Sequence, residues 1–405
     1  MGPTYDVIVI GLGAMGSATC YHLARRGHRV LGLERFDIPH ANGSSTGFSR
    51  MIRMSYHEHP DYIPLLRSSF ELWRTLEAQS GETLLHLTGG LYLGPPDGDL
   101  VGGAVRAAEK FSLPHTVLDR AELHQRFPQF SVPEDFVGML EENAGFVLPE
   151  RAIAAHALLA MRLGAELHGQ EAVEHWETNG ASVKVVTAKN VYHAGKIIFC
   201  GGAWTDHLVR DLGVPLLVTR QVLGWVWPKR PELFERGRIP VWNIDALDGT
   251  VHYGFPMMAD NPGFKLAHHS PGAPVNPDTV PRSVLPGDEG TFRGVLRRYI
   301  PDADGPLLSL RTCLYTNSPD KHFIVDRHPM HERVILACGF SGHGFKFAPV
   351  IGDALADLAT KGVTAHPIDF LGLQRLQGGS KVFGPRTHPT PRDCALGKDG
   401  KSGCN

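Results

Sequence analysis

The sequence feature that most constrains the fold is a glycine-rich turn at residues 11–16, with the sequence GLGAMG. A short apolar run rich in β-branched residues, 5–10, precedes the turn, and a helical pattern follows it as far as residue 26. A second apolar run covers residues 29–33. This order of strand, turn, helix and strand is typical of the βαβ unit that binds a dinucleotide. We therefore expect a parallel sheet covered by helices at the start of the chain.

Each glycine of the turn has its own physical role in such a unit. Gly11 permits the tight turn, Gly13 lets the backbone approach a pyrophosphate, and Gly16 allows the helix to pack closely on the strand. The helix amino terminus offers free N–H groups and a partial positive charge to phosphate oxygens. Glu34 follows Gly16 by 18 residues, where its carboxylate accepts hydrogen bonds from ribose hydroxyls. These residues predict dinucleotide binding, and an ordinary glycine-rich turn is the alternative.

Length and charge restrict the number of domains and the class of partner. The chain has 405 residues, more than the roughly 100–200 residues of one ordinary domain, so we expect two or three domains. Hydrophobic residues make up 42% of the chain and charged residues 20%, as in a typical globular protein. The formal net charge of −2 gives no electrostatic reason to expect nucleic acid or a membrane surface as a partner. A small molecule is the favoured partner.

Cysteine usage and the amino terminus bear on compartment and metal binding. No two cysteines form a CxxC or CxxH pair, which argues against a zinc site and a disulfide framework, so we expect no bound metal. No run approaches the ~18 apolar residues of a membrane span, and the first strand begins too early to leave room for a cleavable signal. These features favour the cytoplasm. The cysteines are Cys20, Cys200, Cys313, Cys338, Cys394 and Cys404.

Strand and helix patterns predict an α/β domain built from separate pieces and a second, antiparallel β domain. The apolar strand 196–200 ends in a glycine-rich turn, as does the strand 334–338, and a helix follows at 348–360. Other helices are expected at 62–79 and 149–163. Between the two late strands the chain is richer in proline, aromatic residues and strand-like alternation.

The expected domains are therefore discontinuous. The final segment is polar and rich in glycine, proline and lysine, which is typical of a loose tail. We assign residues 1–80, 145–214 and 320–375 to a Rossmann-like nucleotide-binding domain, residues 81–144 and 215–319 to a substrate domain, and residues 376–405 to the tail.

Further short motifs occur throughout both expected domains. They are residues 39–40 (PH), 49–53 (SRMIR), 201–204 (GGAW), 312–315 (TCLY) and 341–347 (SGHGFKF). Together with the first glycine turn, their order and spacing resemble the monomeric sarcosine oxidase and N-methyltryptophan oxidase family. The resemblance covers about residues 4–370, and its motifs are more specific than a glycine turn alone because they lie in both domains.

The resemblance implies a flavoprotein oxidase in which FAD is the nucleotide of the first domain. Such an enzyme takes a hydride from the carbon next to the secondary amine of a small N-methylated amino acid, and the resulting imine hydrolyses. The expected products are a primary amino acid, an aldehyde and hydrogen peroxide, with dioxygen as the electron acceptor. The resemblance favours a monomer and leaves open which N-alkyl or cyclic amino acid is the substrate.

For the cofactor, the resemblance implies a thioether bond between the flavin ring and Cys313, and a buried free cysteine is the alternative interpretation. Family members often have a histidine close to this linkage where the chain has Thr46, so the efficiency of the linkage is open. Non-covalent contacts with FAD are expected from Gly11, Gly13, Gly16, Glu34, Gly202, Trp204, Gly342 and Gly344.

Three residues match catalytic positions of the family: Lys265, His269 and Arg50. Lys265 is expected to lie over the flavin ring and promote the reaction with oxygen, because a fixed ammonium stabilises negative charge that develops there. Arg50 is expected near the flavin, and His269 resembles an active-site histidine. The alternatives are a solvated surface lysine and a structural histidine.

Four further residues match the substrate site of the family. Arg53 and Lys346 match a pair of cations that holds the substrate carboxylate, and two such cations need an anion to offset their repulsion. Tyr253 and Tyr315 match aromatic positions around the substrate. The alternatives are surface positions for the cations and ordinary core packing for the tyrosines.

Two other functions stay open at this point. One is a flavin-dependent amino acid or imino acid dehydrogenase of similar fold that passes electrons to an acceptor other than oxygen. The other is a nucleotide-binding module without turnover, in which Lys265, Arg53 and Lys346 would have no evident task. Peroxide production separates an oxidase from the first alternative, and flavin bleaching by an N-methyl amino acid excludes the second.

Overall fold

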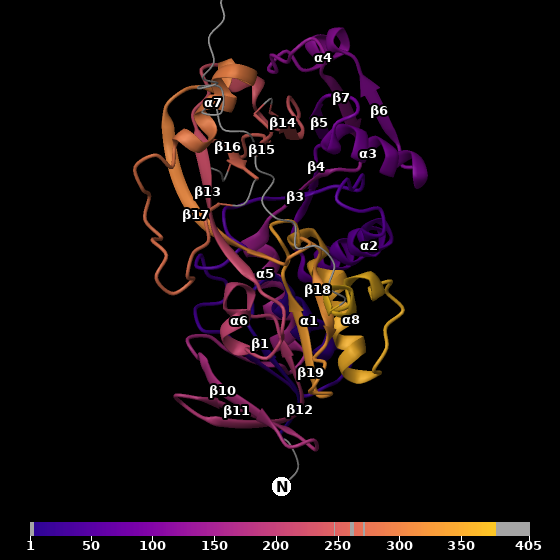
Figure 1. The fold of residues 1–405 in the computed structure, drawn as a ribbon, viewed down its shortest axis with the longest axis vertical. Coiled ribbons are helices and arrows are strands. Elements are labelled where there is room, and N and C mark those ends of the chain that lie inside the picture. Colours follow the sequence, from indigo (N-terminus) through magenta and orange to yellow (C-terminus); the bar gives the residue numbers. More distant parts are fainter. Residues whose placement is uncertain (1–3, 247, 260–262, 270–271, 378–405) are drawn as a thin grey trace, which may run out of the picture.

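The computed structural model describes residues 4–246, 248–259, 263–269 and 272–377. These residues form one large sheet in the lower half of Figure 1 and another in the upper half. We call the lower one, which contains β1 (Tyr5–Ile10), the parallel sheet, and the upper one, which contains β15 (Val251–Phe255), the mixed sheet. A third sheet of three strands, the bridging sheet, lies between them (Figure 1). The predicted combination of α/β and β architecture is confirmed.

The parallel sheet has the strand order β10-β11-β12-β1-β2-β9, with β19 also beside β12 and β18 beside β19. Strands β9, β2, β1, β12 and β19 run parallel to one another. Strands β1, β2 and β19 are almost wholly buried, as expected when both faces of a sheet are covered. The strands are β1 (Tyr5–Ile10), β2 (Val30–Leu33), β9 (Glu166–His168), β10 (Val173–Thr178), β11 (Val183–Thr187), β12 (Val191–Phe199), β18 (Ile324–Arg327) and β19 (Val334–Cys338).

Helix α1 (Ala14–Arg25) packs between α5 (Pro149–Arg162) and α8 (Ala348–Thr360), and α2 (Tyr62–Ser80) packs against α5 and α8. Small residues allow this close packing of α1. A Cβ atom added to Gly352 of α8 would lie 2.7 Å from the Cβ of Ala18 in α1. The main apolar core of the protein lies among these helices and one face of the parallel sheet.

The mixed sheet has the strand order β17-β13-β16-β15-β14-β5-β7-β6. Its neighbours are antiparallel as predicted, except that β14 and β5 run parallel. A hairpin connection enforces antiparallel neighbours, and no hairpin joins β5 to β14, because they come from different chain segments. The strands are β5 (Gly90–Gly94), β6 (His115–Leu118), β7 (Val137–Glu141), β13 (Leu217–Val226), β14 (Val241–Asp245), β15 (Val251–Phe255), β16 (Phe264–His268) and β17 (Leu307–Asn317).

The bridging sheet consists of β3 (Arg50–Ile52), β8 (Gly145–Val147) and β4 (Leu85–Leu87), with β8 in the centre. Gly145 of β8 is close to β4, since an added Cβ would lie 2.0 Å from the carbonyl oxygen of His86. This sheet fixes β3, which leads directly from the parallel-sheet half of the protein into the site described below.

The helices predicted at 62–79, 149–163 and 348–360 are confirmed to within one residue at their ends, whereas the strand expected at 196–200 is the last part of the longer strand β12. Helix α7 was not predicted, although Phe292, Val295, Leu296 and Tyr299 form a helical apolar stripe. None of the helices in the described residues is long and apolar enough to cross a membrane. The remaining α-helices are α3 (Asp99–Lys110), α4 (Arg120–Arg126), α6 (Thr205–Leu208), α7 (Gly290–Tyr299) and α9 (Gln374–Gln377).

The predicted domain boundaries meet at the bridging sheet. Its strand β4 was assigned to the substrate domain, whereas β3 and β8 were assigned to the nucleotide-binding domain. The boundaries at 80/81 and 144/145 therefore stay a prediction. The first two residues of the predicted tail, 376 and 377, belong to α9, and the rest of the tail lies outside the described residues.

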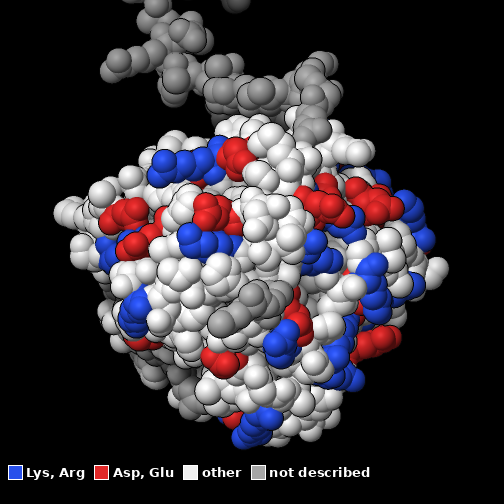
Figure 2. Space-filling view, turned by 90° about the horizontal axis from the view of Figure 1, so that it is seen from below, with Lys and Arg blue, Asp and Glu red and all other residues white. Residues whose placement is uncertain are grey.

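Figure 2 shows the molecule from below, at the end formed by the parallel sheet. Lysine and arginine side chains alternate with aspartate and glutamate side chains over this face. A mixed surface of this kind produces no extended field of one sign.

The contact between α1 and α8 gives a stability test. Gly352→Ala should lower the thermal unfolding midpoint, because the added methyl group overlaps Ala18 and such overpacking typically costs about 1–3 kcal/mol. Gly294→Ala in α7 is the matched control: no atom lies within 4 Å of its added Cβ, so the higher helix propensity of alanine should raise the midpoint or leave it unchanged. Equal midpoints for the two variants would contradict this account of the packing.

Candidate active site

A cavity of about 970 Å³ opens at the carboxyl ends of the parallel strands. Its volume is at the upper end of the ~300–1,000 Å³ typical of small-molecule sites. Ile10, Leu33 and Cys200 line it where β1, β2 and β12 end. The chain leaves β1 for β2 on one side, while β12 lies on the other side, and such a switch point is where ligands bind in open α/β sheets.

The first glycine turn forms one wall of the cavity. Gly11 has a φ of 88°, and a Cβ added to it would lie 2.5 Å from the carbonyl oxygen of Cys200. A Cβ added to Gly16 would lie 1.8 Å from the carbonyl oxygen of Gly11, so Gly16 serves packing and does not line the cavity. Gly13 lines the cavity at the start of α1, with no atom within 4 Å of an added Cβ. The open space in front of this helix end suits a phosphate group.

Glu34 lies at the end of β2, is only 5% exposed and lines the cavity. Its Oε2 accepts a hydrogen bond from the Leu12 N–H at 2.8 Å, and its Oε1 accepts one from the Phe36 N–H at 3.0 Å. These two bonds fix the carboxylate beside the glycine turn. Carboxylate oxygens have further acceptor capacity, which is what recognition of ribose hydroxyls requires.

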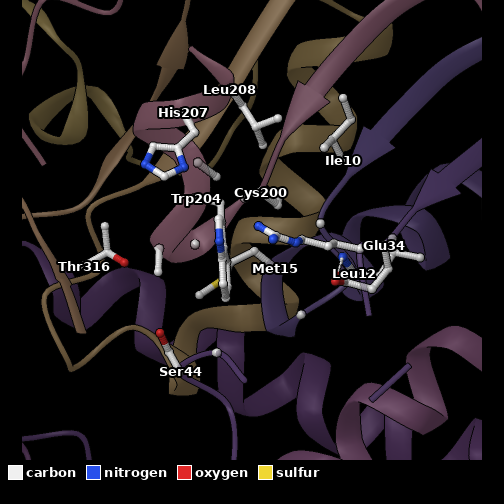
Figure 3. Close-up of a pocket in the computed structure, with 18 of the residues that line it drawn as sticks. Ile10, Leu12, Met15, Glu34, Ser44, Cys200, Trp204, His207, Leu208 and Thr316 are labelled. Carbon is white, nitrogen blue, oxygen red and sulfur yellow. Dashed lines mark hydrogen bonds between the residues drawn. The ribbon is translucent and has the colours of Figure 1, made fainter. Parts of the chain in front are cut away.

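Trp204 extends into the space between Glu34 and Thr316 in Figure 3. Its indole N–H donates to Oδ1 of Asp278 at 2.8 Å, and the Arg35 guanidinium lies 5.5 Å from its ring centroid. Asp278 and Arg35 also form an ion pair at 2.6 Å. These contacts hold a flat aromatic surface against the cavity.

The other two glycine turns also line the cavity. Gly202 has a φ of 53°, with no atom within 4 Å of an added Cβ. An added Cβ would lie 2.4 Å from the Tyr315 ring at Gly342 and 2.5 Å from the Phe340 ring at Gly344. The turn after β19 therefore tolerates no side chain at either position without movement.

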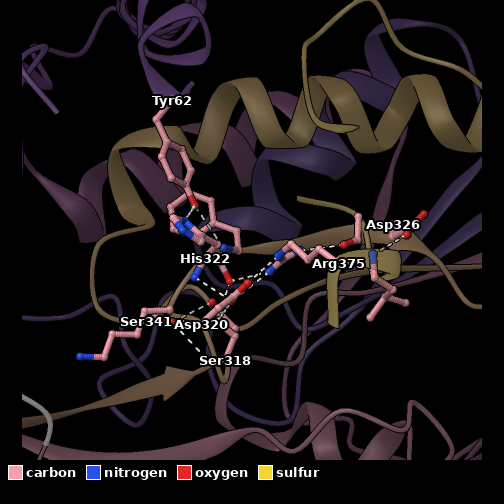
Figure 4. Close-up of polar contacts among 12 residues, drawn as sticks. Tyr62, Ser318, Asp320, His322, Asp326, Ser341 and Arg375 are labelled. Carbon is pink, nitrogen blue, oxygen red and sulfur yellow. Dashed lines mark hydrogen bonds and ion pairs between the residues drawn. The ribbon is translucent and has the colours of Figure 1, made fainter. Parts of the chain in front are cut away.

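A polar network holds this last turn, as Figure 4 shows. The Ser341 hydroxyl accepts a hydrogen bond from the Ser318 N–H at 3.2 Å, and the Ser318 hydroxyl donates to the carbonyl of His322 at 2.6 Å. Arg375 of α9 donates to Asp320 at 2.7 Å and to the carbonyl of His322 at 3.1 Å. The end of the described chain is thereby tied to the turn that carries Gly342 and Gly344.

Arg50 is the first residue of β3 and lines the cavity. Its guanidinium donates to the carbonyls of Ser49 at 2.9 Å and Ser44 at 2.7 Å. The loop before β3 thus folds around the Arg50 side chain, which still lines the cavity.

Lys265 is fully buried in β16 and is not among the residues that line the cavity. Its ammonium donates to the carbonyls of Gly47 and Ser49, both at 2.7 Å, and to the Ser49 hydroxyl at 3.0 Å. Burial lowers the pKa of Lys265 well below its usual range, and Arg50 acts in the same direction. The alternative of a surface lysine is therefore excluded, while the role of Lys265 stays a prediction.

Cys313 is fully buried in β17, opposite Gln221 of β13. Burial raises the pKa of its thiol, whereas Arg50, Lys265 and Arg282 oppose this effect. The peptide N–H of the next residue, Leu314, donates to the carbonyl of Gly43 at 3.3 Å. Cys313 therefore lies behind the loop that precedes β3, in an electropositive neighbourhood.

Arg53 and Lys346, far apart in the sequence, are brought together as predicted. Both are 5% exposed, and their charged groups lie 4.5 and 5.1 Å from the ring centroid of Tyr56. Arg53 donates to Glu58, and Lys346 donates to the carbonyl of His343 at 2.8 Å. Burial, and after it the charge of Arg53, lowers the pKa of Lys346 to about 7, although Glu58 opposes them.

Tyr253, Tyr315 and His269 form a cluster beside these cations. The Tyr315 hydroxyl lies 3.4 Å from Nδ1 of His269, and both tyrosine rings meet the imidazole edge to face at 5.8 Å. Burial lowers the pKa of His269 to about 4; Glu58 opposes this, while Arg53 acts with burial. His269 is therefore neutral at pH 7, and the structure brings every predicted substrate-side residue into one region.

No sequence motif identified the other acidic side chains of the site. Glu141, at the end of β7, is 1% exposed and accepts hydrogen bonds from the N–H groups of Met54 and Ser55 and from the Tyr92 hydroxyl. It thereby holds the backbone directly after Arg53. Glu58 and Glu150 were also missed, and the only sequence signal for Glu58 is its place five residues after Arg53.

Two further clusters of acids and histidines have metal-ligand spacing within the described residues. In the first, His328 accepts a hydrogen bond from the Met330 N–H through Nδ1, so its Nε2–H donates to Asp211 at 3.2 Å. In the second, Arg26 forms ion pairs with both carboxylates. Hydrogen bonds and ion pairs within the chain therefore satisfy both. The clusters are Asp211, His328 and His331, and Asp353, Asp357 and His366.

Comparison with known proteins defines the class. The family model described as FAD dependent oxidoreductase (DAO) matches residues 6–358, and the chain belongs to this family. Its cofactor is FAD. The chain is 47% identical to a monomeric sarcosine oxidase of Streptomyces avermitilis over 93% of this chain and 99% of the relative. It is 33% identical to an N-methyl-L-tryptophan oxidase of Salmonella enteritidis PT4, over 88% and 94% of the two chains.

Solved structures show the same fold. NikD, an unusual amino acid oxidase essential for nikkomycin biosynthesis, superposes with a TM-score of 0.80 and 27% identity over 91% of this chain and 97% of NikD. An L-proline dehydrogenase from P. horikoshii superposes with a TM-score of 0.78 at 21% identity, over 94% and 100% of the chains, which shows the fold alone.

The residues present fit FAD. The open helix end at Gly13 suits the pyrophosphate, the fixed Glu34 carboxylate suits the ribose, and the cavity continues past Trp204 to Arg50 and Tyr315. The adenosine part would therefore lie at the first glycine turn and the flavin part at the β3 end.

The lowered pKa of Lys346 predicts that carboxylate binding depends on pH. With its pKa near 7, Lys346 carries its charge below pH 7 and loses it as the pH rises further, while Arg53 stays charged. The dissociation constant of a carboxylate that lacks an amine should therefore rise between pH 6 and 8. In Lys346→Met this inflection should disappear. Titration of the flavin absorbance with acetate at several pH values measures both, and an unchanged inflection in the variant would assign it to another group.

Proposed function

We propose that the protein is an FAD-dependent oxidase of small N-methylated amino acids, with sarcosine and related secondary amines as its substrates. The products are a primary amino acid, an aldehyde and hydrogen peroxide. The names of the relatives with 47% and 33% identity support this class of substrate. The FAD supplies, when bound, the two-electron oxidation of the amine and the reduction of dioxygen.

The observation that carries the substrate class is the charge balance around Arg53. Arg53 and Lys346 are both buried cations on one tyrosine ring, and Glu58 supplies a single negative charge to them. Buried charges require partners, so a second anion stabilises this group. A substrate carboxylate supplies that anion and receives charge-assisted hydrogen bonds in return.

The same cations favour the uncharged form of the substrate amine. Arg53 and Lys346 lie on the carboxylate side, and Arg50 lies at the flavin end of the cavity. A cation near an ammonium lowers its pKa, so the bound amine is held deprotonated. Its lone pair then assists the departure of hydride from the neighbouring carbon. His269 is neutral at pH 7, and with Tyr253 and Tyr315 it surrounds the amine without adding charge.

Lys265 supports the oxidase function against the dehydrogenase alternative. Its ammonium is fixed by three hydrogen bonds close to Arg50 and Cys313. Such a preorganised charge stabilises negative charge that develops when dioxygen is reduced, and it costs no reorganisation. A dehydrogenase has no need of this group.

We further propose that the enzyme acts as a monomer in the cytoplasm. The name of the Streptomyces relative supports the monomer, and the four cysteines of the described residues, all of them free, support a reducing compartment.

A substrate panel tests the proposed function. Purified protein should produce peroxide in air with sarcosine, N-methyltryptophan or a cyclic imino acid, and far less with an N-methylamine of the same size that lacks the carboxylate. Loss of one charge-assisted hydrogen bond costs about 1.5–3 kcal/mol, so Arg53→Met or Lys346→Met should raise KM for the amino acid at least tenfold. The carboxylate-free amine should be affected little. Equal losses for both amines, or turnover without peroxide, would refute the proposal.

Covalent attachment of FAD to Cys313 is the proposal for the cofactor. Burial raises the pKa of the Cys313 thiol, and the cations Arg50, Lys265 and Arg282 offset part of that rise, which favours the thiolate, the reactive form of cysteine. After acid precipitation the yellow colour should stay with the wild-type protein and move to the supernatant in Cys313→Ala. Cys338→Ala is the matched control, because Cys338 is equally buried. In this variant the yellow colour should stay with the precipitated protein. Colour in the wild-type supernatant would show that the flavin is not covalently bound.

A further inference from the structure

The loop before β3 forms an anion-binding turn that already contains an anion. Gly47 has a φ of 102° and Phe48 a φ of 68°, a left-handed conformation that residues other than glycine rarely adopt. The Gly47 N–H donates to Oε1 of Glu150 at 2.7 Å, the Phe48 N–H donates to the same oxygen at 3.3 Å, and the Thr46 hydroxyl donates to it at 3.3 Å. Consecutive N–H groups that converge in this way form a nest for negative charge.

The same loop receives a cation through its carbonyl groups. The Lys265 ammonium donates to the carbonyls of Gly47 and Ser49 and to the Ser49 hydroxyl. The N–H groups of Gly47 and Phe48 therefore point toward the Glu150 carboxylate, whereas the carbonyls of Gly47 and Ser49 point toward the ammonium. This orientation of peptide dipoles between an anion and a cation stabilises both charges.

We propose that Glu150 is a positioning residue for Lys265. It holds residues 46–49 in the one conformation whose carbonyls receive the Lys265 ammonium. Glu150 is not among the residues that line the cavity. The proposal rests on the oxygen role assigned to Lys265 above, and it adds a residue from α5, on the other side of the loop, to that role.

The charge of Glu150 also acts on Lys265 directly. Burial lowers the pKa of Lys265 most, Arg50 and Arg311 lower it further, and Glu150 and Cys313 oppose them. Lys265 is charged at low pH and loses its proton as the pH rises through its depressed pKa. Removal of the Glu150 charge lowers this pKa again, so the loss of the ammonium begins at a lower pH. At a pH above the pKa of Lys265 in both proteins, each further unit by which this pKa falls lowers the charged fraction of Lys265 about tenfold.

A purely structural role for Glu150 makes a different prediction. Glu150 lies in the first turn of α5, where an acidic side chain interacts favourably with the helix dipole. If that were its whole contribution, its loss would weaken the fold without any dependence on Lys265. Coupling between the two residues therefore separates the two interpretations.

The kinetic test uses the holoenzyme and four proteins: wild type, Glu150→Gln, Lys265→Met and the double variant. Stopped-flow spectra measure flavin reduction by sarcosine without air and, separately, reoxidation by dioxygen across the pH range. In Glu150→Gln the midpoint of the reoxidation profile should shift to lower pH, and reoxidation should slow more than reduction does. In the Lys265→Met background, Glu150→Gln should have no further effect on reoxidation. An unshifted midpoint, or the same fold-loss in both backgrounds, would overturn the proposal.

A second measurement does not depend on turnover. Hydrogen–deuterium exchange of the peptide that covers residues 43–50 should be faster in Glu150→Gln than in wild type, because two N–H groups lose their charged acceptor. Glu82→Gln is the matched control, since Glu82 forms an ion pair with Arg151, next to Glu150, without contact with the loop. It should leave both exchange and the pH profile unchanged.

The exchange result also separates the role of Glu150 in the loop from the oxygen role of Lys265. If Lys265→Met alone does not slow reoxidation, the oxygen role in the proposed function fails, while exchange still decides whether Glu150 holds the loop. If Glu150→Gln does not give folded holoenzyme, Glu150→Asp keeps the charge on a shorter side chain. It should speed exchange but keep the midpoint near the wild-type value; wild-type exchange in this variant would overturn the proposal.

Discussion

The site depends on one stretch of backbone, residues 43–58, which is held between two buried or partly buried carboxylates. Glu150 binds its first part and Glu141 binds the part after Arg53. Between them, β3 pairs with β8 in the bridging sheet, so the stretch cannot slide along the sheet without the loss of its hydrogen bonds. Because Arg50 and Arg53 belong to this stretch and Lys265 donates to it, the cations at the flavin end and the substrate end are fixed by the same backbone.

These carboxylates also make the accumulation of positive charge tolerable. Four buried or partly buried cations, Arg50, Arg53, Lys265 and Lys346, occupy the region between the two large sheets. Burial of unpaired charge is costly, and acids that bind the same backbone stretch offset part of that cost. The remaining positive charge is useful, since the reaction brings in a carboxylate and later generates negative charge as dioxygen is reduced.

The features that the sequence predicted are those that depend on residues close to one another along the chain. The turn at residues 11–16, Glu34, and the helices α2, α5 and α8 follow from local spacing and apolar periodicity. The substrate-side residues were found by resemblance, and the structure places Arg53 beside Lys346. Glu141 and Glu150 were not predictable, because their partners are backbone N–H groups 86 to 103 positions away, which carry no sequence signal. The parallel pairing of β5 with β14 escaped prediction because the two strands are not joined by a hairpin.

The central claim is that this backbone stretch presents a secondary-amine amino acid to FAD in an oxidase. The visible spectrum of the purified protein, recorded before and after anaerobic addition of sarcosine and again after air is admitted, tests it most directly. The account predicts an oxidised flavin spectrum that bleaches with the amino acid and returns in air, with peroxide formed as the colour recovers. A flavin spectrum that sarcosine and its N-methyl relatives leave unchanged, or one that bleaches but does not recover in air, would contradict it.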